Sequence, residues 1–294
     1  MSSATRSATR GQDQRWPMPV ADADRSATAS MGEVARHQLQ WRGRSGKPLT
    51  LAIVVLVWQA VGLLNQAMPF YNALLFPAPW DLLVAGWRLA QSGVLWWDIV
   101  VSTARVLIGT LVAAPIAILL GIAVARIRLL EVGVEPIIEV LRPVPTLALL
   151  PMIILWFGIG ETSKVLFIAY SCFFVIFTTT LIGVRNVDPI LLHAGASLGF
   201  SRLQVYRFII LRAVLPDIML GLRLGLSVGF LVIVAAEFIA ADTGLGYLIN
   251  YSRTWFRVAD MLVGAIIIGL LGVTVNYALV AVERRMFRWR ATDT

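Results

Sequence analysis

The stretch DPILLHAGASLGFSRLQVYRFIILRAVLP, residues 188–216, decides how the rest of the chain is interpreted, and we call it the elbow. It has a helical pattern but is too polar to lie in lipid, although long apolar runs flank it on both sides. Asp188 is predicted to cap a first helix, which ends at Gly199. Ser201 and Gln204 form a Ser-x-x-Gln capping box that opens a second short helix. The sequence therefore predicts two short helices joined at a glycine corner.

The composition places the chain in a lipid bilayer. Of its 294 residues, 58% are hydrophobic and only 14% are charged, which is too apolar for a soluble globular domain. The net charge of +8 raises the question of nucleic acid, but the arginines stand in blocks beside apolar runs, where they set membrane orientation. We therefore expect no nucleic-acid partner. The single cysteine, Cys172, excludes a disulfide within the chain and a cysteine-based metal site.

Six apolar segments are predicted to span the bilayer, which makes the fold class all-α and polytopic. They lie near residues 49–64, 99–125, 141–157, 165–184, 215–240 and 259–282. Pro143, Pro145 and Pro151 remove backbone donors from the third segment and bend it, so we expect it to face protein or a water-filled cavity. Residues 65–98 are rich in tryptophan and proline and are expected to lie along the outer headgroup layer.

Arginine and lysine gather at every connection that six spans place on one side of the membrane. By the positive-inside rule this side is the cytoplasm, and both termini lie there too. The expected domains are a disordered cytoplasmic tail at 1–48, a six-span region at 49–285 and a cytoplasmic C-terminal tail at 286–294.

Two features within the spans are candidates for packing and for the substrate pathway. Gly221, Gly225 and Gly229 repeat at four-residue spacing in the fifth segment, so they share a face that another helix can approach, within the bundle or across a dimer. Glu237 stands near the outer surface, where it either lines a gate or faces water. Arg105 is interpreted mainly as an anchor that snorkels to the interface, with a contact in the pathway as the alternative.

Motifs for nucleotide or metal binding are missing from the sequence. A phosphate-binding loop needs a glycine five residues before Gly46-Lys47, and Trp41 stands there, so we expect no bound nucleotide. His37 and His193 have no carboxylate or thiol at ligand spacing, which argues against a metal site. No catalytic residue is assigned. The spans hold almost no ionisable groups, which argues against a proton-driven carrier.

At the elbow the sequence resembles the cytoplasmic loop of permease subunits of ATP-binding-cassette importers. The family pattern is Glu-Ala-Ala, then a glycine after three residues, then nine residues, a β-branched residue and Leu-Pro. The corresponding positions hold His193-Ala194-Gly195, Gly199, Ile209 and Leu211-Arg212. His193 replaces the glutamate, so no salt bridge is assigned to that position, whereas Gly199 preserves the corner.

Four further stretches look like the nitrate, sulfonate, taurine and bicarbonate group of these permeases: 76–83, 102–121, 141–161 and 235–249. The resemblance implies a type I importer permease fold in the cell inner (plasma) membrane, with coupling helices at 188–212. It also implies two ATPase subunits that carry ATP and Mg²⁺, a second permease copy as a homodimer, and an extracytoplasmic substrate-binding protein. The residues implied at the ATPase interface are His193, Ala194, Gly195, Leu198, Gly199 and Phe200.

The expected function is therefore that of a non-catalytic permease subunit, which imports a small anion or an organosulfur compound. Closure of the ATPases would move the elbow and exchange inward-open for outward-open spans. The alternative is an autonomous channel or secondary transporter, which would show paired half-repeats or buried acids. A membrane-embedded enzyme is a third reading, and it would need a cluster of catalytic polar groups.

Overall fold

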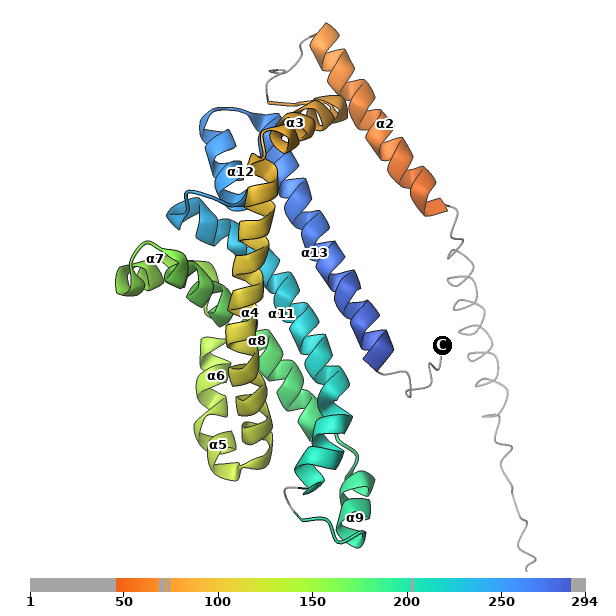
Figure 1. Cartoon of the computed structure of the whole chain (residues 1–294), viewed down its shortest axis with the longest axis vertical. Helices are drawn as coiled ribbons and strands as arrows, with labels where there is room; N and C mark the ends of the chain where they lie inside the picture. The colour runs from red at the N-terminus through yellow and green to blue at the C-terminus, as the bar shows by residue number, and fades with distance from the viewer. Residues whose placement is uncertain (1–45, 69–71, 73–74, 202–203, 287–294) are drawn as a thin grey trace, which may run out of the picture. The chain divides into compact units, whose positions relative to one another are not determined.

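A computed structural model (Figure 1) describes residues 46–68, 72, 75–201 and 204–286. The chain divides into two compact units, Met1–Val57 and Trp58–Thr294, and the description below concerns the second unit by itself. The tails expected at 1–48 and 286–294 lie outside the described residues, except for residues 46–48 and 286, which are helical.

Every regular element of the described residues is a helix. In chain order these are α2 (Gly46–Ala67), α3 (Pro79–Gln91), α4 (Val94–Arg126), α5 (Arg128–Gly133), α6 (Glu135–Leu141), α7 (Thr146–Phe157), α8 (Glu161–Arg185), α9 (Pro189–Ser197), the π-helical turn η1 (Val205–Ile210), α11 (Leu211–Ala240), α12 (Leu245–Thr254) and α13 (Val258–Met286). Among them are five helices long and apolar enough to cross a membrane, or six if a bent pair counts as one crossing. The predicted all-α fold of apolar spanning helices is therefore confirmed.

The third predicted span, residues 141–157, covers only the second arm of a bent helix pair, because the first arm lies before its predicted start. The helices Arg128–Leu141 and Thr146–Phe157 meet at an angle of 100°. Pro143 and Pro145 stand in the short break between them, and a proline has no N–H to continue a helical ladder. Pro151 lies inside α7 and does not end it. Two of the three prolines therefore coincide with the break, which is sharper than the predicted bend.

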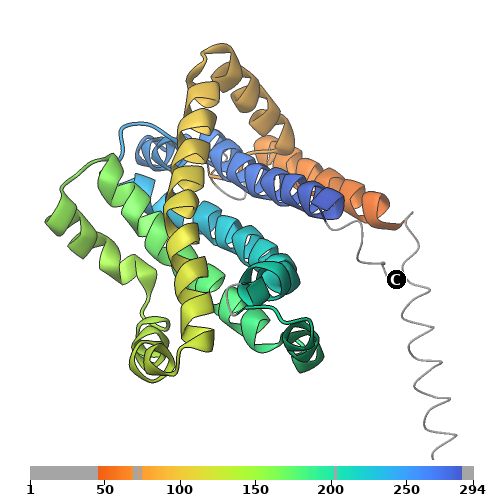
Figure 2. The same ribbon diagram turned by 60° about the horizontal axis from the view of Figure 1, so that its bottom comes forward.

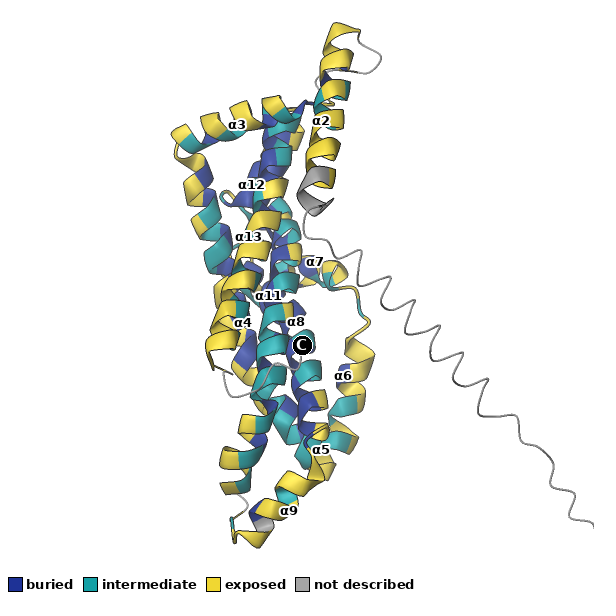
Figure 3. Ribbon diagram, turned by 90° about the vertical axis from the view of Figure 1, so that its right-hand side faces the viewer, coloured by how far each residue is buried: buried dark blue, intermediate teal, exposed yellow. Residues whose placement is uncertain are grey.

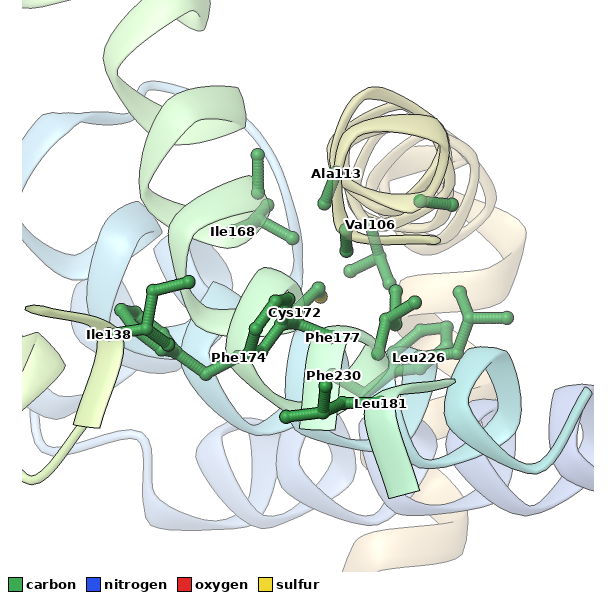
Figure 4. Close-up of a cluster of buried hydrophobic side chains, with 14 of the residues drawn as sticks. Val106, Ala113, Ile138, Ile168, Cys172, Phe174, Phe177, Leu181, Leu226 and Phe230 are labelled. Atoms are coloured by element: carbon green, nitrogen blue, oxygen red, sulfur yellow. The ribbon is translucent and has the colours of Figure 1, made fainter. Parts of the chain in front are cut away.

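The centre of the second unit is formed by α4, α8 and α11, which lie side by side (Figure 2). Their side chains meet in one buried cluster, which includes Val106 of α4, Cys172 and Phe177 of α8, and Leu226 of α11 (Figure 4). Because lipid tails are as apolar as these side chains, close packing rather than removal from water holds such helices together.

The glycines of α11 lie where α11 meets α8 and α4. A Cβ atom added to Gly225 would stand 3.0 Å from Cγ1 of Ile176, and one added to Gly229 would stand 2.9 Å from Cγ1 of Val106. At Gly221 the added atom would meet the side chain of Thr179. Helix α11 approaches its neighbours within the same chain at a distance that only glycine permits.

The first half of the elbow forms as its sequence predicts. The Asp188 carboxylate accepts a hydrogen bond from the N–H of Ile190 at 2.8 Å, and α9 follows. Gly199 has φ of +72°, a left-handed backbone that glycine adopts without strain. The N–H of Phe200 donates to the carbonyl of Gly195 at 3.0 Å, which completes a Schellman motif at the helix end.

The second half of the elbow differs from the prediction. The capping box is present, since the Gln204 side chain accepts from the Ser201 N–H at 2.7 Å and the Ser201 hydroxyl accepts from the Gln204 N–H at 3.4 Å. The helix that follows is not short, however, because η1 runs directly into α11 and residues 205–240 form one 36-residue helix. No glycine stands between Gly199 and Gly221 to end it, and Pro216 lies within it.

Residues 65–98 fold mainly as α3 and the start of α4. Leu82, Ala85 and Leu89 are buried on one face of α3, in a cluster that includes Val263 of α13. The tryptophans at 80, 87, 96 and 97 are all exposed, as an amphipathic segment requires.

Replacing Gly225 with valine is expected to destabilise the protein by about 1–3 kcal/mol, because the added methyl groups overfill the contact with Ile176. The midpoint of thermal unfolding in detergent measures the effect. Gly269→Val in α13 is the matched control, since nothing described lies within 4 Å of the place its Cβ would take. Equal losses in both variants would show that the glycines of α11 do not set the helix approach.

Candidate functional site

Two places in the second unit carry polar groups that the apolar core does not explain. One is the elbow. The other, which we call the charged cluster, consists of Arg105, Glu161, Lys164 and Glu237. Arg105 stands 21 residues before the C-terminal end of α4, so the cluster lies about 30 Å along that helix from the end nearer the elbow.

Arg105 is the centre of the charged cluster. Its Nε and Nη2 donate to the two carboxylate oxygens of Glu161 at 2.7 and 2.6 Å, a two-pronged pairing that fixes orientation as well as distance. Its Nη1 donates to Glu237 at 2.6 Å and to the carbonyl of Thr243 at 2.7 Å. Because the side chain is only 5% exposed, the predicted snorkelling anchor is wrong. The pathway alternative for Arg105 stays a prediction.

Glu237 joins α11 to α4 and to the turn that leads into α12. Its side chain is fully buried, so it does not face water. Besides Arg105, it accepts hydrogen bonds from the hydroxyl of Ser102 at 2.8 Å and from the N–H of Gly246 at 2.7 Å. A carboxylate at a helix N-terminus satisfies free N–H groups and interacts favourably with the helix dipole. Glu237 therefore supports the start of α12, and its role as a gate stays a prediction.

Neighbouring polar groups complete this turn. Ser102 accepts from the N–H of Leu245 at 2.8 Å while donating to Glu237, and Asp98 accepts from the N–H of Gly244 at 2.7 Å. Gly244 has φ of +115°, a backbone that favours glycine. Hydrogen bonds to Asp98 and Ser102, on successive turns of α4, therefore hold this turn against α4.

Sequence reasoning missed several of these groups and underestimated the charge in the spans. Asp98, Lys164 and Asp260 are buried along with Arg105 and Glu237. Asp260 of α13 pairs with Arg88 of α3 at 2.5 Å and also with Arg257. The available signal was the pairing of opposite charges near the expected span ends, since a buried charge requires a partner.

The residues implied at an ATPase interface are brought together by α9 and the glycine corner. His193, Ala194, Leu198 and Gly199 are exposed, as Figure 3 shows for most of α9, and Phe200 is half-buried. Gly195 is buried instead, because α9 packs there on η1. A Cβ at Gly195 would run into Ile209.

An ion pair fixes α8 just before the elbow. Arg185 reaches both carboxylate oxygens of Glu135 in α6, each at 2.7 Å, and Glu131 at 3.1 Å. Figure 1 shows α9 close to this end of α8, far from α12. The start of the elbow is thus linked to the bent third span.

Glu237→Gln is expected to destabilise the protein by about 3 kcal/mol, the lower range for breaking a buried ion pair, because Glu161 still neutralises Arg105. Glu283→Gln is the control, since the partly exposed pair of Glu283 with Arg223 should contribute at most about 1 kcal/mol. Thermal unfolding in detergent compares the two. A smaller loss of stability for Glu237→Gln than for Glu283→Gln would show that the charged cluster does not hold the helices together.

Two solved structures share the fold. One shows inward-facing conformations of the MetNI methionine ABC transporter, with a TM-score of 0.54, 19% identity, and coverage of 64% of this chain and 93% of that chain. The other is an amino acid ABC transporter, with a TM-score of 0.56, 20% identity, and coverage of 67% and 96%. At these identities the likeness shows the fold alone, and it confirms the expected importer permease architecture.

Curated relatives match over most of the chain. The taurine transport system permease protein of Escherichia coli (strain K12) is 36% identical over 263 residues, covering 86% of this chain and 94% of the relative. A permease protein named for aliphatic sulfonates transport in Bacillus subtilis (strain 168) is 33% identical and covers 81% and 85%. The riboflavin transport system permease protein of Chloroflexus aurantiacus is 34% identical and covers 84% and 91%. The sequence pattern of the binding-protein-dependent transport system inner membrane component family matches residues 113–288, and the chain belongs to that family.

Proposed function

We propose that this chain is the membrane-spanning subunit of an importer whose energy comes from ATP hydrolysis in a separate subunit. The observation that carries the proposal is the continuity of residues 205–240, which follow the elbow corner directly as one helix. At 1.5 Å per residue this helix is about 54 Å long. A force on α9 would thus reach Glu237 and the charged cluster through a single rigid element.

The elbow is proposed to face the cytoplasm. Arg185, Arg207 and Arg212 lie in or beside it, and Arg284 and Arg285 end α13. The positive-inside rule places such groups in the cytoplasm, together with both termini. The charged cluster would then lie toward the outer face.

The proposed partners are two ATPase subunits, a second copy of this chain, and an extracytoplasmic substrate-binding protein. The family description names a binding protein, and the relatives are transport permease proteins. ATP and Mg²⁺ would be held by the ATPases. Those subunits would bind the exposed side of α9, where His193 and Leu198 are accessible and the Schellman motif holds the corner rigid.

Transport would follow from a population shift between two arrangements of the spans. ATPase closure favours one arrangement only if the partner binds α9 better in that state. Arg105, Glu161 and Glu237 would hold the outer ends of α4, α8 and α11 together in one arrangement and part in the other. This gives the candidate gate residues a defined role.

The proposed substrate is a small sulfonate or a similar organic anion. Support comes from the relatives named for taurine and for aliphatic sulfonates. The riboflavin relative has a similar identity, so family membership alone does not select the substrate. Calorimetric titration of the cognate binding protein with taurine, alkanesulfonates and nitrate tests this part directly, and a failure of all three to bind would refute it.

Gly199→Val is expected to lower uptake by about tenfold or more while leaving the amount of protein in the membrane unchanged. The left-handed backbone at Gly199 would cost a valine about 1–2 kcal/mol, which displaces the corner. Uptake of labelled taurine by cells that express the complete transporter is the measurement. Gly93→Val is the matched control, because Gly93 also has a positive φ, +79°, and open space around its Cβ, but lies far from the elbow in sequence. Normal uptake by Gly199→Val would refute the coupling role.

A further inference from the structure

A cavity of about 360 Å³ lies at the break between α6 and α7. Its walls also include α8 and Leu224 of α11, and its polar lining consists of Arg142, Thr146, Ser171, Thr178 and Thr179. None of the described residues that line it is acidic. The cavity therefore combines one positive charge with four hydroxyl groups in a region that is otherwise apolar.

The spacing of the hydroxyl side chains on α8 makes this a continuous polar face. Ser171, Thr178 and Thr179 are seven and eight residues apart, two helical turns, and so lie on the same side of the helix. Cys172 and Ile176 of the same helix are buried in the core, and Thr179 borders this packing face because its side chain lies against Gly221 of α11. The polar face thus borders the packing face of α8 and extends over about 12 Å along the helix.

The hydroxyl groups of Ser171 and Thr178 can turn toward a ligand without leaving a carbonyl group unpaired. Ser171 donates to the carbonyl of Phe167 at 2.9 Å, and Thr178 donates to that of Phe174 at 2.7 Å. In a helix such carbonyls also accept the ordinary backbone bond from the fourth residue along, so they keep a partner when the hydroxyl rotates.

Arg142 has no carboxylate partner among the described residues, which is also true of Arg207 and Arg212, but of these three it is the one that lines the cavity. Arg105, Arg185 and Arg223 each pair with a carboxylate. The Arg142 guanidinium makes no ion pair or hydrogen bond with any residue that the structure describes, and it lines the cavity. An arginine presents several N–H donors in a plane, which suits the oxygens of a sulfonate or a phosphate.

We propose that this cavity binds the oxyanion group of the transported compound, with Arg142 supplying the charge and the α8 hydroxyls supplying hydrogen bonds. The chemistry is that of a singly charged tetrahedral oxyanion, which a sulfonate shares with a lipid phosphate, and we assign the site to the sulfonate. The assignment of the anion as cargo rests on the proposed function. The proposal adds to that function a substrate contact beside the bent third span.

Cysteine labelling of the purified full chain in detergent tests the site. Thr178→Cys places a thiol in the cavity, and the native Cys172 should not react because it is fully buried. The probes are 2-sulfonatoethyl methanethiosulfonate, an anion, and its trimethylammonium counterpart, a cation. Arg142→Gln should lower the ratio of anionic to cationic labelling rates at residue 178 by about tenfold, since it removes a nearby positive charge.

The controls separate this charge from general surface charge. Arg128→Gln removes an arginine whose side chain is 82% exposed and outside the cavity, and it should leave the ratio unchanged. For Leu198→Cys on the elbow, the ratio of anionic to cationic labelling rates should be the same with and without Arg142→Gln. Arg142→Lys keeps the charge and should retain most of the ratio. Equal effects of Arg142→Gln and Arg128→Gln would overturn the proposal.

Protection experiments identify the anion. Ethanesulfonate should slow the labelling of Thr178→Cys but not of Leu198→Cys, and the protection should vanish with Arg142→Gln. In vesicles, protection by phosphatidylglycerol over phosphatidylcholine, with none by ethanesulfonate, would assign the site to a lipid headgroup and overturn the proposal. No ATPase is involved in these measurements, so their failure leaves the elbow test unaffected, and failure of the elbow test leaves them interpretable.

Discussion

The buried pairing of Arg105 with Glu161 and Glu237 is the interaction on which the arrangement of α4, α8 and α11 depends. Apolar packing has little directionality, and a helix can slide or rotate against its neighbour at small cost. A guanidinium out of reach of water has no such freedom, because each lost hydrogen bond leaves a charge without compensation. The three helices are therefore held in one register at this end, while toward the elbow α8 is also held by the ion pair of Arg185 with Glu135.

The long helix of residues 205–240 connects these two kinds of contact. At one end it follows the elbow corner, which is closed by backbone hydrogen bonds and a capping box. Near its other end Glu237 is bound to Arg105, Ser102 and the start of α12. Motion at the elbow must either carry the whole helix as a rigid body or separate charges at the far end. The charged cluster therefore holds α4, α8 and α11 together and also resists movement of the long helix.

The sequence was informative where local chemistry decides structure and less so where distant segments meet. The cap at Asp188, the corner at Gly199 and the apolar spans depend on neighbouring residues, so they were predictable. The continuation of the second elbow helix into α11 was missed because Pro216 was taken as a boundary. The partners of Arg105 were missed because Glu161 and Glu237 are 56 and 132 residues away along the chain. Snorkelling was a reasonable expectation for an isolated arginine, but Arg105 pairs with carboxylates from two other helices.

The close contact between Gly195 and Ile209 has a consequence for the exposed side of α9. Where the family pattern places an alanine, this chain has no side chain, and Ile209 occupies the space. Restoring alanine at that position alone would force the end of the Ile209 side chain to move, which changes how α9 packs on η1. If the proposed ATPases bind α9, position 195 would therefore influence their fit indirectly, through Ile209.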